Sequence, residues 1–415
     1  MSHSPAPHRL TAVLHTGTPA LQQGTAPVNV PVVRTSTVRF ANCAALHEHH
    51  HRRSSGERVA SYGRHGMDTH RALEDAVTAL EGGHQAFLTP SGLSAITLVL
   101  LALLSPGDHA LVADSVYSPV RRVDTTLLQR LGITLEYFSA SQDDLAQKIR
   151  PNTKLLYLES PSSLLYEVLD LPALAAVARQ HGIPVATDNT WSGGWFYQPL
   201  KLGANISIQA ATKYIAGHSD VMQGIVVVDS AQLAHKVATT YEALGLTVSA
   251  DDAYLALRGL RTLPVRLAQH QRNATAVAQW LQTQPQVSHV FYPALPSDPG
   301  HALWQRDFSG ASGLVSFAFH DHIAPSAAEA FVDALHWFAL GASWGGYESL
   351  VLLCAAERLR EHSIWQGHQT VVRLHIGLED PRDLMADLAQ ALRATGGPSA
   401  ASPTAADAAP ATAHT

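Results

Sequence analysis

Between residues 85 and 228, short apolar runs alternate with longer stretches in which apolar residues recur at helical spacing. The runs are rich in Val, Ile, Leu and Ala, which is typical of strands buried on both faces. They lie at 86–89, 110–113, 135–138, 155–158, 185–187, 206–210 and 225–228. Helical patterns separate most of them, as at 171–180. This alternation predicts an α/β fold with a mostly parallel, seven-stranded sheet between helices, whose ligands would bind beyond the strand ends.

The pattern changes after about residue 251. Long helical stretches over 253–276 are followed by further strand candidates and helices, which predict a smaller α+β domain. These strands are expected at 287–292, 314–319, 350–354 and 371–376, and the helices at 327–335 and 384–392. We therefore expect an N-terminal arm (1–65), an α/β domain (66–255), a C-terminal α+β domain (256–394) and a disordered tail (395–415) that is rich in Gly, Pro, Ser, Ala and Thr.

Composition narrows the functional class. The 415 residues are 46% hydrophobic and 15% charged, which is an ordinary globular composition, and the net charge of −6 argues against a nucleic-acid-binding protein. Two cysteines, Cys43 and Cys354, suit a reducing compartment. The N-terminus shows no export signal, and the apolar run 98–104 is too short to span a membrane. We expect a cytoplasmic protein that binds neither nucleic acid nor membrane.

Lys213 is the most suggestive single residue. It follows the apolar run 206–211 directly, so a strand would deliver its amine into a desolvated pocket. Desolvation lowers the pKa of a lysine and makes it nucleophilic. A surface lysine at the end of a strand remains an equally good interpretation of this stretch alone.

Five other residues suit an anionic or aromatic ligand. Gly92 and Leu93 begin a helix, where free N–H groups attract phosphate, although plain helix capping explains the same pattern. Asp188 ends an apolar strand and needs a cationic or hydrogen-bonding partner. Tyr117 ends another strand and could stack on a flat ring. Arg373 lies within an apolar strand, where an α-carboxylate or an internal acid would satisfy it.

Two hydrolase motifs are also present. The run 47–51 matches the H-E-x-x-H zinc signature, but its low-complexity surroundings favour a solvated loop. Residues 341–345 match the G-x-S-x-G elbow with Ser343 as nucleophile, and Glu348 followed by His362, His368 or His375 could complete a triad. Because Gly345 and Gly346 are poor residues to begin the required helix, we keep a serine hydrolase as a remote alternative.

Several motifs resemble the Cys/Met-metabolism family of pyridoxal-phosphate (PLP) enzymes. The segment 207–214 reads Ser-Ile-Gln-Ala-Ala-Thr-Lys-Tyr and is followed by Gly-His-Ser-Asp at 217–220. The segments 343–349 (Ser-Trp-Gly-Gly-Tyr-Glu-Ser) and 373–380 (Arg-Leu-His-Ile-Gly-Leu-Glu-Asp) also resemble the family, as does Glu-Ser-Pro at 159–161. The likeness extends over about 11–394 and is strongest to its bacterial cystathionine beta-lyases.

The resemblance implies a type I PLP fold and a homotetramer of closely joined dimers. It also implies cleavage of L-cystathionine to homocysteine, pyruvate and ammonia, a carbon–sulfur lyase reaction towards methionine, with cysteine or cystine desulfhydration as a side activity. In the family the lysine at position 213 forms a Schiff base with the cofactor. The resemblance also implies that Asp188 and Tyr117 bind the ring and that Tyr117 is catalytic, helping to deprotonate the incoming substrate amine. The implied phosphate ligands are Gly92, Leu93 and Thr212, with Tyr62 and Arg64 of the neighbouring subunit. Substrate binding is implied for Arg373, Ser343 and Trp344, and for the neighbouring subunit's Tyr62.

Some positions depart from the family pattern. Met67, Ser163 and Ala210 replace residues common in relatives, and Ala210 puts one phosphate contact in doubt. Elimination at Cβ and at Cγ use the same lysine and ring, so physical reasoning leaves a gamma-lyase, a gamma-synthase or a methionine gamma-lyase open. A protein with this fold that only binds ligands is a further alternative.

Overall fold

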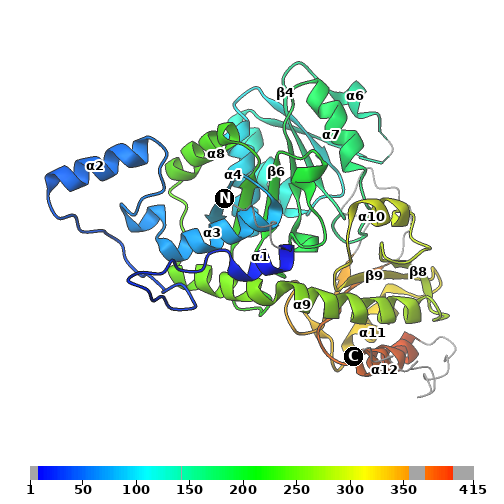
Figure 1. Cartoon of the computed structure of the whole chain (residues 1–415). Coiled ribbons are helices and arrows are strands. Elements are labelled where there is room, and N and C mark those ends of the chain that lie inside the picture. The colour runs from blue at the N-terminus through cyan, green and yellow to red at the C-terminus, as the bar shows by residue number, and fades with distance from the viewer. Residues whose placement is uncertain (1–7, 142, 355–369, 396–415) are drawn as a thin grey trace.

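A computed structural model describes residues 8–141, 143–354 and 370–395 (Figure 1). Its central sheet has seven strands in the order β1-β7-β6-β5-β4-β2-β3. The strands are β1 (Gln85–Thr89), β2 (His109–Ala113), β3 (Thr134–Phe138), β4 (Thr153–Glu159), β5 (Val185–Asp188), β6 (Ile206–Ala210) and β7 (Gly224–Val228). Only β7 runs antiparallel to its neighbours, β1 and β6. The prediction of a mostly parallel, seven-stranded sheet is therefore confirmed.

Helices cover both faces of this sheet. They are α3 (Asp68–Glu81), α4 (Gly92–Leu103), α5 (Pro119–Val123), α6 (Leu145–Lys148), α7 (Leu171–Gln180) and α8 (Ala231–Ala243). Side chains along β7 alternate between two cores: Val226 and Val228 join the core that includes α4, and Ile225 and Val227 join the core that includes α3. Burial on both faces explains why these strands are continuous apolar runs.

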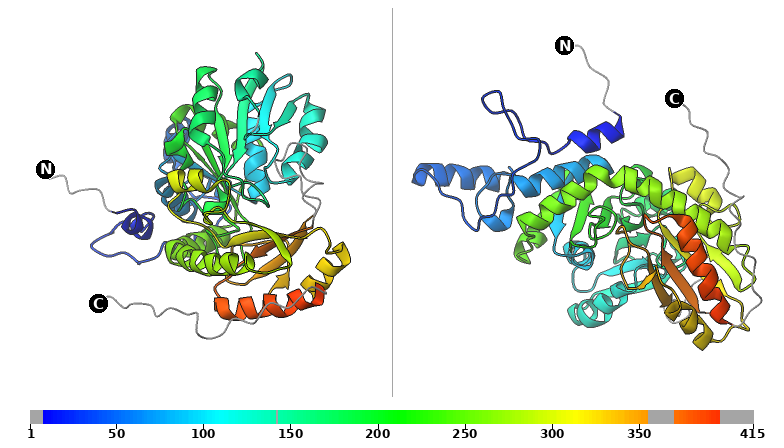
Figure 2. Two further views of the ribbon diagram at one scale, coloured as in Figure 1. Left: turned by 90° about the vertical axis from the view of Figure 1, so that its right-hand side faces the viewer. Right: turned by 90° about the horizontal axis from the view of Figure 1, so that it is seen from below.

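A second sheet has the order β10-β11-β12-β9-β8. Its strands are β8 (Val287–Phe291), β9 (Leu314–Phe319), β10 (Ala339–Leu340), β11 (Leu350–Cys354) and β12 (Val371–His375), and its helices are α10 (His301–Asp307), α11 (Pro325–Asp333) and α12 (Pro381–Leu392). The long helix α9 (Ala250–Leu281) runs between the two sheets (Figure 2). It crosses the expected boundary at 255/256, so the proposed domain limits remain a prediction.

The N-terminal segment contains two helices that the sequence analysis did not predict, α1 (Arg9–His15) and α2 (Cys43–Ser54). The loop expected at 47–51 is wrong, because these residues lie within α2, whose N-cap Asn42 accepts a hydrogen bond from the Ala45 N–H. Helix α2 has no buried residue and projects from the body of the molecule (Figure 1). No group of His, Cys, Asp or Glu in the described residues could hold a metal ion, so the zinc motif lacks its site.

The described residues also contain short helical turns. These are η1 (Gly63–His65), η2 (Asp124–Leu128), η3 (Gln129–Leu131), η4 (Thr190–Ser192), η5 (Pro199–Leu202) and η7 (Arg393–Thr395). The disordered tail expected at 395–415 lies almost wholly outside the described residues. The two cysteines are free, Cys43 exposed and Cys354 buried.

A buried carboxylate ties helix α3 to the strands that carry the site. Glu81 accepts hydrogen bonds from the side-chain amides of Asn189 and Gln209, and Arg9 lies close enough for its charge to stabilise the carboxylate. Burial nevertheless raises the pKa of Glu81 to about 7. The folded protein therefore holds a proton there that the unfolded chain releases above its ordinary pKa of 4.5.

Stability is expected to fall as pH rises from 4.5 to about 7, because the folded state binds more protons than the unfolded state in that window. Glu81 contributes on the order of 3 kcal/mol to this fall. Glu81→Gln should flatten the slope of unfolding free energy against pH, measured by urea titration. Glu74, whose pKa is also raised to about 7, remains in both proteins, so only their difference reports on Glu81. An unchanged slope would contradict this assignment.

Candidate active site

Lys213 lies just beyond the end of β6, where the sequence pattern places it, and it is half-buried. Its Nζ donates a hydrogen bond of 2.9 Å to Ser343 Oγ and lies 5.2 Å from the centroid of the Trp344 ring. Burial lowers the pKa of Lys213 to about 8; the charge of Arg373 adds to the effect and that of Asp188 opposes it. The unprotonated, nucleophilic fraction of this amine near neutral pH is therefore much larger than for an ordinary lysine, although it remains the minor form.

Asp188 ends the neighbouring strand β5 and is buried. Its Oδ1 accepts two hydrogen bonds from Thr190, from the backbone N–H at 2.9 Å and from the hydroxyl at 2.6 Å. Thr190 in turn accepts from the Ala210 N–H at 2.9 Å, which links Asp188 to the strand that carries Lys213. Burial raises the pKa of Asp188, and the Thr190 bonds and the Lys213 charge oppose the rise. Both bonds go to Oδ1, and no described residue donates a hydrogen bond to Oδ2.

Tyr117 is 46% exposed, so its ring presents a free surface to a ligand. Its backbone N–H donates to Glu159 Oε2 at 2.6 Å, and Glu159 ends β4. Burial raises the pKa of the Tyr117 hydroxyl, together with the nearby charges of Glu159 and Asp188, against the charge of Arg373. Tyr117, Asp188, Arg373 and Lys213 therefore lie close enough for their charges to alter one another's pKa values, and we treat them as one site.

The first turn of α4 approaches this site closely. A Cβ on Gly92 would lie 2.7 Å from the Ala210 side chain, so the residue must be glycine for α4 to abut the end of β6. The N–H groups of Gly92 and Leu93 belong to the first turn and have no partner within the helix. The Thr212 hydroxyl is bonded to the Gln223 backbone, accepting from its N–H at 2.9 Å and donating to its carbonyl at 3.2 Å. To donate to a phosphate, Thr212 would have to turn its hydroxyl proton away from that carbonyl.

Arg373 lies on β12, half-buried. Its Nη2 donates to the carbonyl of Ala342 at 2.8 Å and to that of Ser343 at 3.2 Å. Both acceptors are backbone atoms, so these bonds orient the guanidinium without neutralising it. The internal salt bridge that the sequence left open does not occur among the described residues, and Arg373 keeps a net charge for an anionic ligand.

The serine hydrolase alternative is wrong on geometry. The residues after Ser343 form bends rather than the helix that a nucleophile elbow requires. The Ser343 hydroxyl accepts from Lys213, and the Nε2 of His375 accepts from the backbone of Gly345 instead of facing the serine. Among the described residues Ser343 therefore has no histidine base and is instead the hydrogen-bond partner of Lys213, whereas His362 and His368 lie outside the described residues.

His375 is a part of the site that the sequence analysis named only as a possible base for Ser343. It is fully buried on β12; its Nε2 accepts the Gly345 N–H at 3.0 Å and its Nδ1 donates to the Glu348 carbonyl at 3.0 Å. Burial holds the pKa of His375 well below its usual range, which keeps the ring in the neutral form that both bonds need. Gly345, at φ +92°, would place a Cβ 2.8 Å from the Lys213 backbone. His375 thus holds the Ser343–Gly345 turn against Lys213.

His375→Ala is expected to lower kcat/KM by about 10- to 100-fold, because it leaves a buried N–H unpaired and loosens the turn that carries Ser343. A positioning role predicts that the pH at which activity rises shifts upward as well, since Lys213 becomes better hydrated. His320→Ala, at an exposed histidine, is the matched control and should behave like the wild type. Loss of folding stability with an unchanged pH profile would show that His375 acts only in packing.

Tyr62 and Arg64 are not brought to Lys213 within one chain. The Arg64 guanidinium lies 5.8 Å from the Tyr62 ring centroid and donates to the Glu242 carbonyl, near the end of α8. Tyr62 is 44% exposed. Both side chains are thus exposed on the surface of the chain.

Comparison with known proteins places this chain in a family. No helix among the described residues is both long and apolar enough to cross a membrane. A cystathionine beta-lyase from Bordetella avium is 52% identical over 94% of this chain and 99% of its own length. The cystathionine beta-lyase of Escherichia coli K12 is 40% identical over 87% of this chain and 92% of its own length.

The crystal structure of a cystathionine gamma synthase from Xanthomonas oryzae superposes with a TM-score of 0.84 at 33% identity, covering 94% of this chain and 99% of that one. This similarity confirms the fold that the sequence resemblance implied. A family model for the Cys/Met metabolism PLP-dependent enzymes matches residues 10–393. The chain therefore belongs to the Cys/Met metabolism family of PLP-dependent enzymes.

Proposed function

We propose that this protein is a carbon–sulfur lyase that splits L-cystathionine by α,β-elimination into L-homocysteine, pyruvate and ammonia, a step towards methionine. The observation that carries the proposal is the half-buried amine of Lys213 between Arg373 and Asp188. The charge of Arg373 lowers the pKa of this amine, and the charge of Asp188 raises it. The names of the relatives support the same reaction. Desulfhydration of cysteine or cystine would follow from the same chemistry.

The residues of the site fit PLP. When bound, this cofactor supplies an aldehyde that links to an amine and an electron-poor ring that accepts the electrons of a carbanion at Cα. We propose that Asp188, through its free Oδ2, holds the proton on the pyridine nitrogen, and that Tyr117 offers its exposed ring as a stacking surface. The first-turn N–H groups of Gly92 and Leu93, with Thr212, would bind the phosphate.

Lys213 would move protons during the reaction. Its amine, unprotonated in part because of its lowered pKa, removes the proton from the substrate Cα and delivers a proton to the departing sulfur. Ser343 holds the amine through their hydrogen bond, and Trp344 covers it on one side. Holding the amine in one position lowers the entropic cost of reaching the geometry needed for proton transfer.

Arg373 would bind the substrate α-carboxylate with a pair of parallel hydrogen bonds and so orient Cα towards Lys213. Arg373→Lys keeps the charge but loses the planar fork, so KM should rise by about 10- to 100-fold with a smaller change in kcat. Arg382→Lys, at an exposed arginine paired with Asp380, is the matched control. Unaltered KM in Arg373→Lys would place the carboxylate elsewhere.

We further propose that the enzyme works in the cytoplasm as a homotetramer in which Tyr62 and Arg64 serve the cofactor phosphate, and Tyr62 also the substrate, in the neighbouring subunit's site. Their surface position supports this arrangement. So does the exposure of apolar side chains in the N-terminal arm, where Leu21 is 74% and Val28 86% exposed. A neighbouring copy would remove such side chains from water.

Product analysis with L-cystathionine tests the proposed reaction directly. Pyruvate with homocysteine is the expected outcome, whereas 2-oxobutyrate with cysteine would identify a gamma-lyase. The gamma alternative remains relevant because both eliminations need the same lysine and the same ring. Absence of turnover with any thioether amino acid would leave only a binding function.

A further inference from the structure

A cavity lies at the edge of the large sheet opposite the candidate active site. The site residues follow the carboxyl ends of β5 and β6, whereas this cavity is built where β4 begins and just before β5 begins. The end of α4 and the middle of α8 complete it. Its volume is about 310 Å³, and its lining includes Arg150, Pro151, Lys154, His181, Pro184 and Lys236. That volume is at the lower end of the range for small-molecule sites.

The lining is strongly cationic. Arg150, Lys154 and Lys236 contribute positive charge, His181 adds a fourth basic side chain, and the lining contains no Asp or Glu. The chain as a whole carries a net charge of −6 and has five lysines, so two of the five meet in this cavity. Positive charge gathered in one cavity creates a local positive electrostatic potential, which attracts anionic ligands even though the protein as a whole is acidic.

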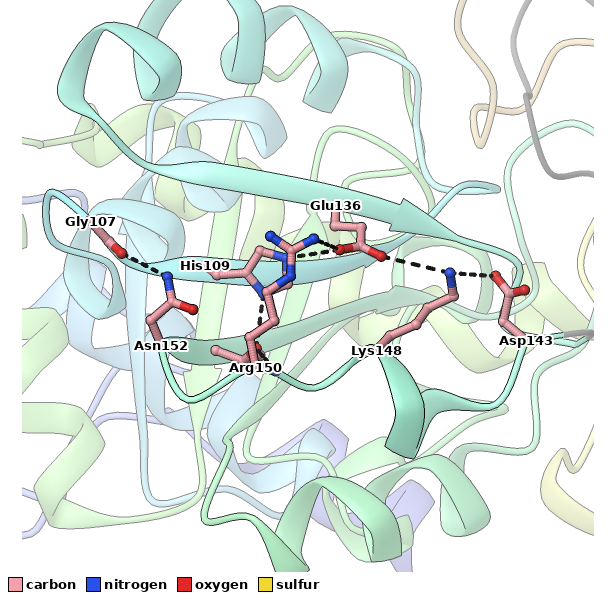
Figure 3. A network of polar contacts seen from close by, with 8 residues as sticks. Gly107, His109, Glu136, Asp143, Lys148, Arg150 and Asn152 are labelled. Carbon is pink, nitrogen blue, oxygen red and sulfur yellow. Dashed lines mark hydrogen bonds and ion pairs between the residues drawn. The ribbon is translucent and has the colours of Figure 1, made fainter.

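The neighbouring charges are already balanced among themselves. Figure 3 shows Arg150 and Lys148 on either side of Glu136, with Lys148 also reaching Asp143. The two cations, Arg150 and Lys148, are therefore balanced by the two carboxylates, and the ion pair with Glu136 orients Arg150. Lys154 and Lys236 form no ion pair with any described residue, so their charges remain available.

We propose that this cavity binds a small ligand with two or more phosphate groups. Lysine ammonium groups bind phosphate as point charges that tolerate variable geometry, and two lysines beside a fixed arginine suit a ligand with more than one phosphate. Pro151 and Pro184 lack N–H groups, and the ends of α4 and α7 turn carbonyl oxygens outward. Recognition therefore rests on the side-chain charges, chiefly those of Lys154 and Lys236.

The experiment titrates inorganic pyrophosphate into the PLP-loaded protein by calorimetry at low ionic strength. The loaded form is needed because the cofactor phosphate cradle would otherwise compete, and retention of the visible absorption shows that the cofactor stays bound. Saturable binding that weakens as salt is added is expected. Lys154→Ala combined with Lys236→Ala should weaken binding about tenfold.

Lys201→Ala removes the same charge from a lysine that bonds to Gln198 outside the cavity, and it should bind as the wild type does. Both variants keep the active-site residues, so unchanged cystathionine turnover would show that they are folded. Absence of saturable binding would overturn the proposal. So would binding that survives in the double variant, or binding that Arg373→Lys abolishes, because either result would place the ligand elsewhere.

Discussion

Lys213→Ala is expected to lower the rate of cystathionine cleavage by at least about 10⁴-fold and to remove the visible absorption of the bound cofactor. The variant loses both the amine that attaches the cofactor and the group that moves protons at Cα and sulfur. The remaining site would still bind the phosphate and the ring, so cofactor should remain detectable after denaturation. Absorbance spectra and initial rates measure the two effects together.

The matched control is Lys201→Ala, since Lys201 is a surface lysine bonded to Gln198. It should keep both the spectrum and the rate. Adding a small primary amine to Lys213→Ala should restore a fraction of the activity, because the cavity left by the side chain can admit it. If Lys213→Ala retained the wild-type spectrum and rate, Lys213 would have no part in the chemistry.

Asp188→Asn is expected to lower kcat by about 10²- to 10³-fold with little change in KM. Asparagine keeps the shape of the side chain and can still accept from Thr190, but it cannot hold a proton on the pyridine nitrogen by charge. The ring then accepts electrons poorly, which affects the carbanion and not the binding of substrate. Steady-state kinetics across several pH values provides the measurement.

Thr190→Val tests the positioning of Asp188 while leaving its charge in place. The substitution removes the hydroxyl that donates to Asp188 and accepts from the Ala210 N–H. A loss of about tenfold is expected, smaller than that of Asp188→Asn, since the backbone bond from Thr190 N–H persists. An Asp188→Asn enzyme with the wild-type kcat would show that the carboxylate is structural.

The large sheet was predictable because its strands are buried on both faces. Strand β6 was predicted at 206–210 and is found at Ile206–Ala210, since an apolar run of that length between polar turns has few alternatives. Lys213 stood out for the same reason, as a charge placed directly after a buried strand. Its chemistry, however, came from the resemblance of its surroundings, because the position alone fits a surface lysine equally well.

Other features left no usable signal in the sequence. Helix α2 has no buried residue, so it has no apolar face whose spacing could reveal a helix. His375 stands in an apolar strand like any core residue, and its role depends on Gly345, thirty positions earlier in the chain. Thr190 also gains its role from a contact with Ala210, twenty positions away. Such long-range contacts follow from tertiary packing, which local patterns do not encode.

The most direct test of the central claim is to reduce the PLP-loaded enzyme with borohydride, digest it and identify the modified peptide by mass spectrometry. The account predicts that the cofactor is fixed to Lys213 and to no other lysine. Attachment to any of the remaining four lysines, Lys148, Lys154, Lys201 or Lys236, or to none, would contradict it.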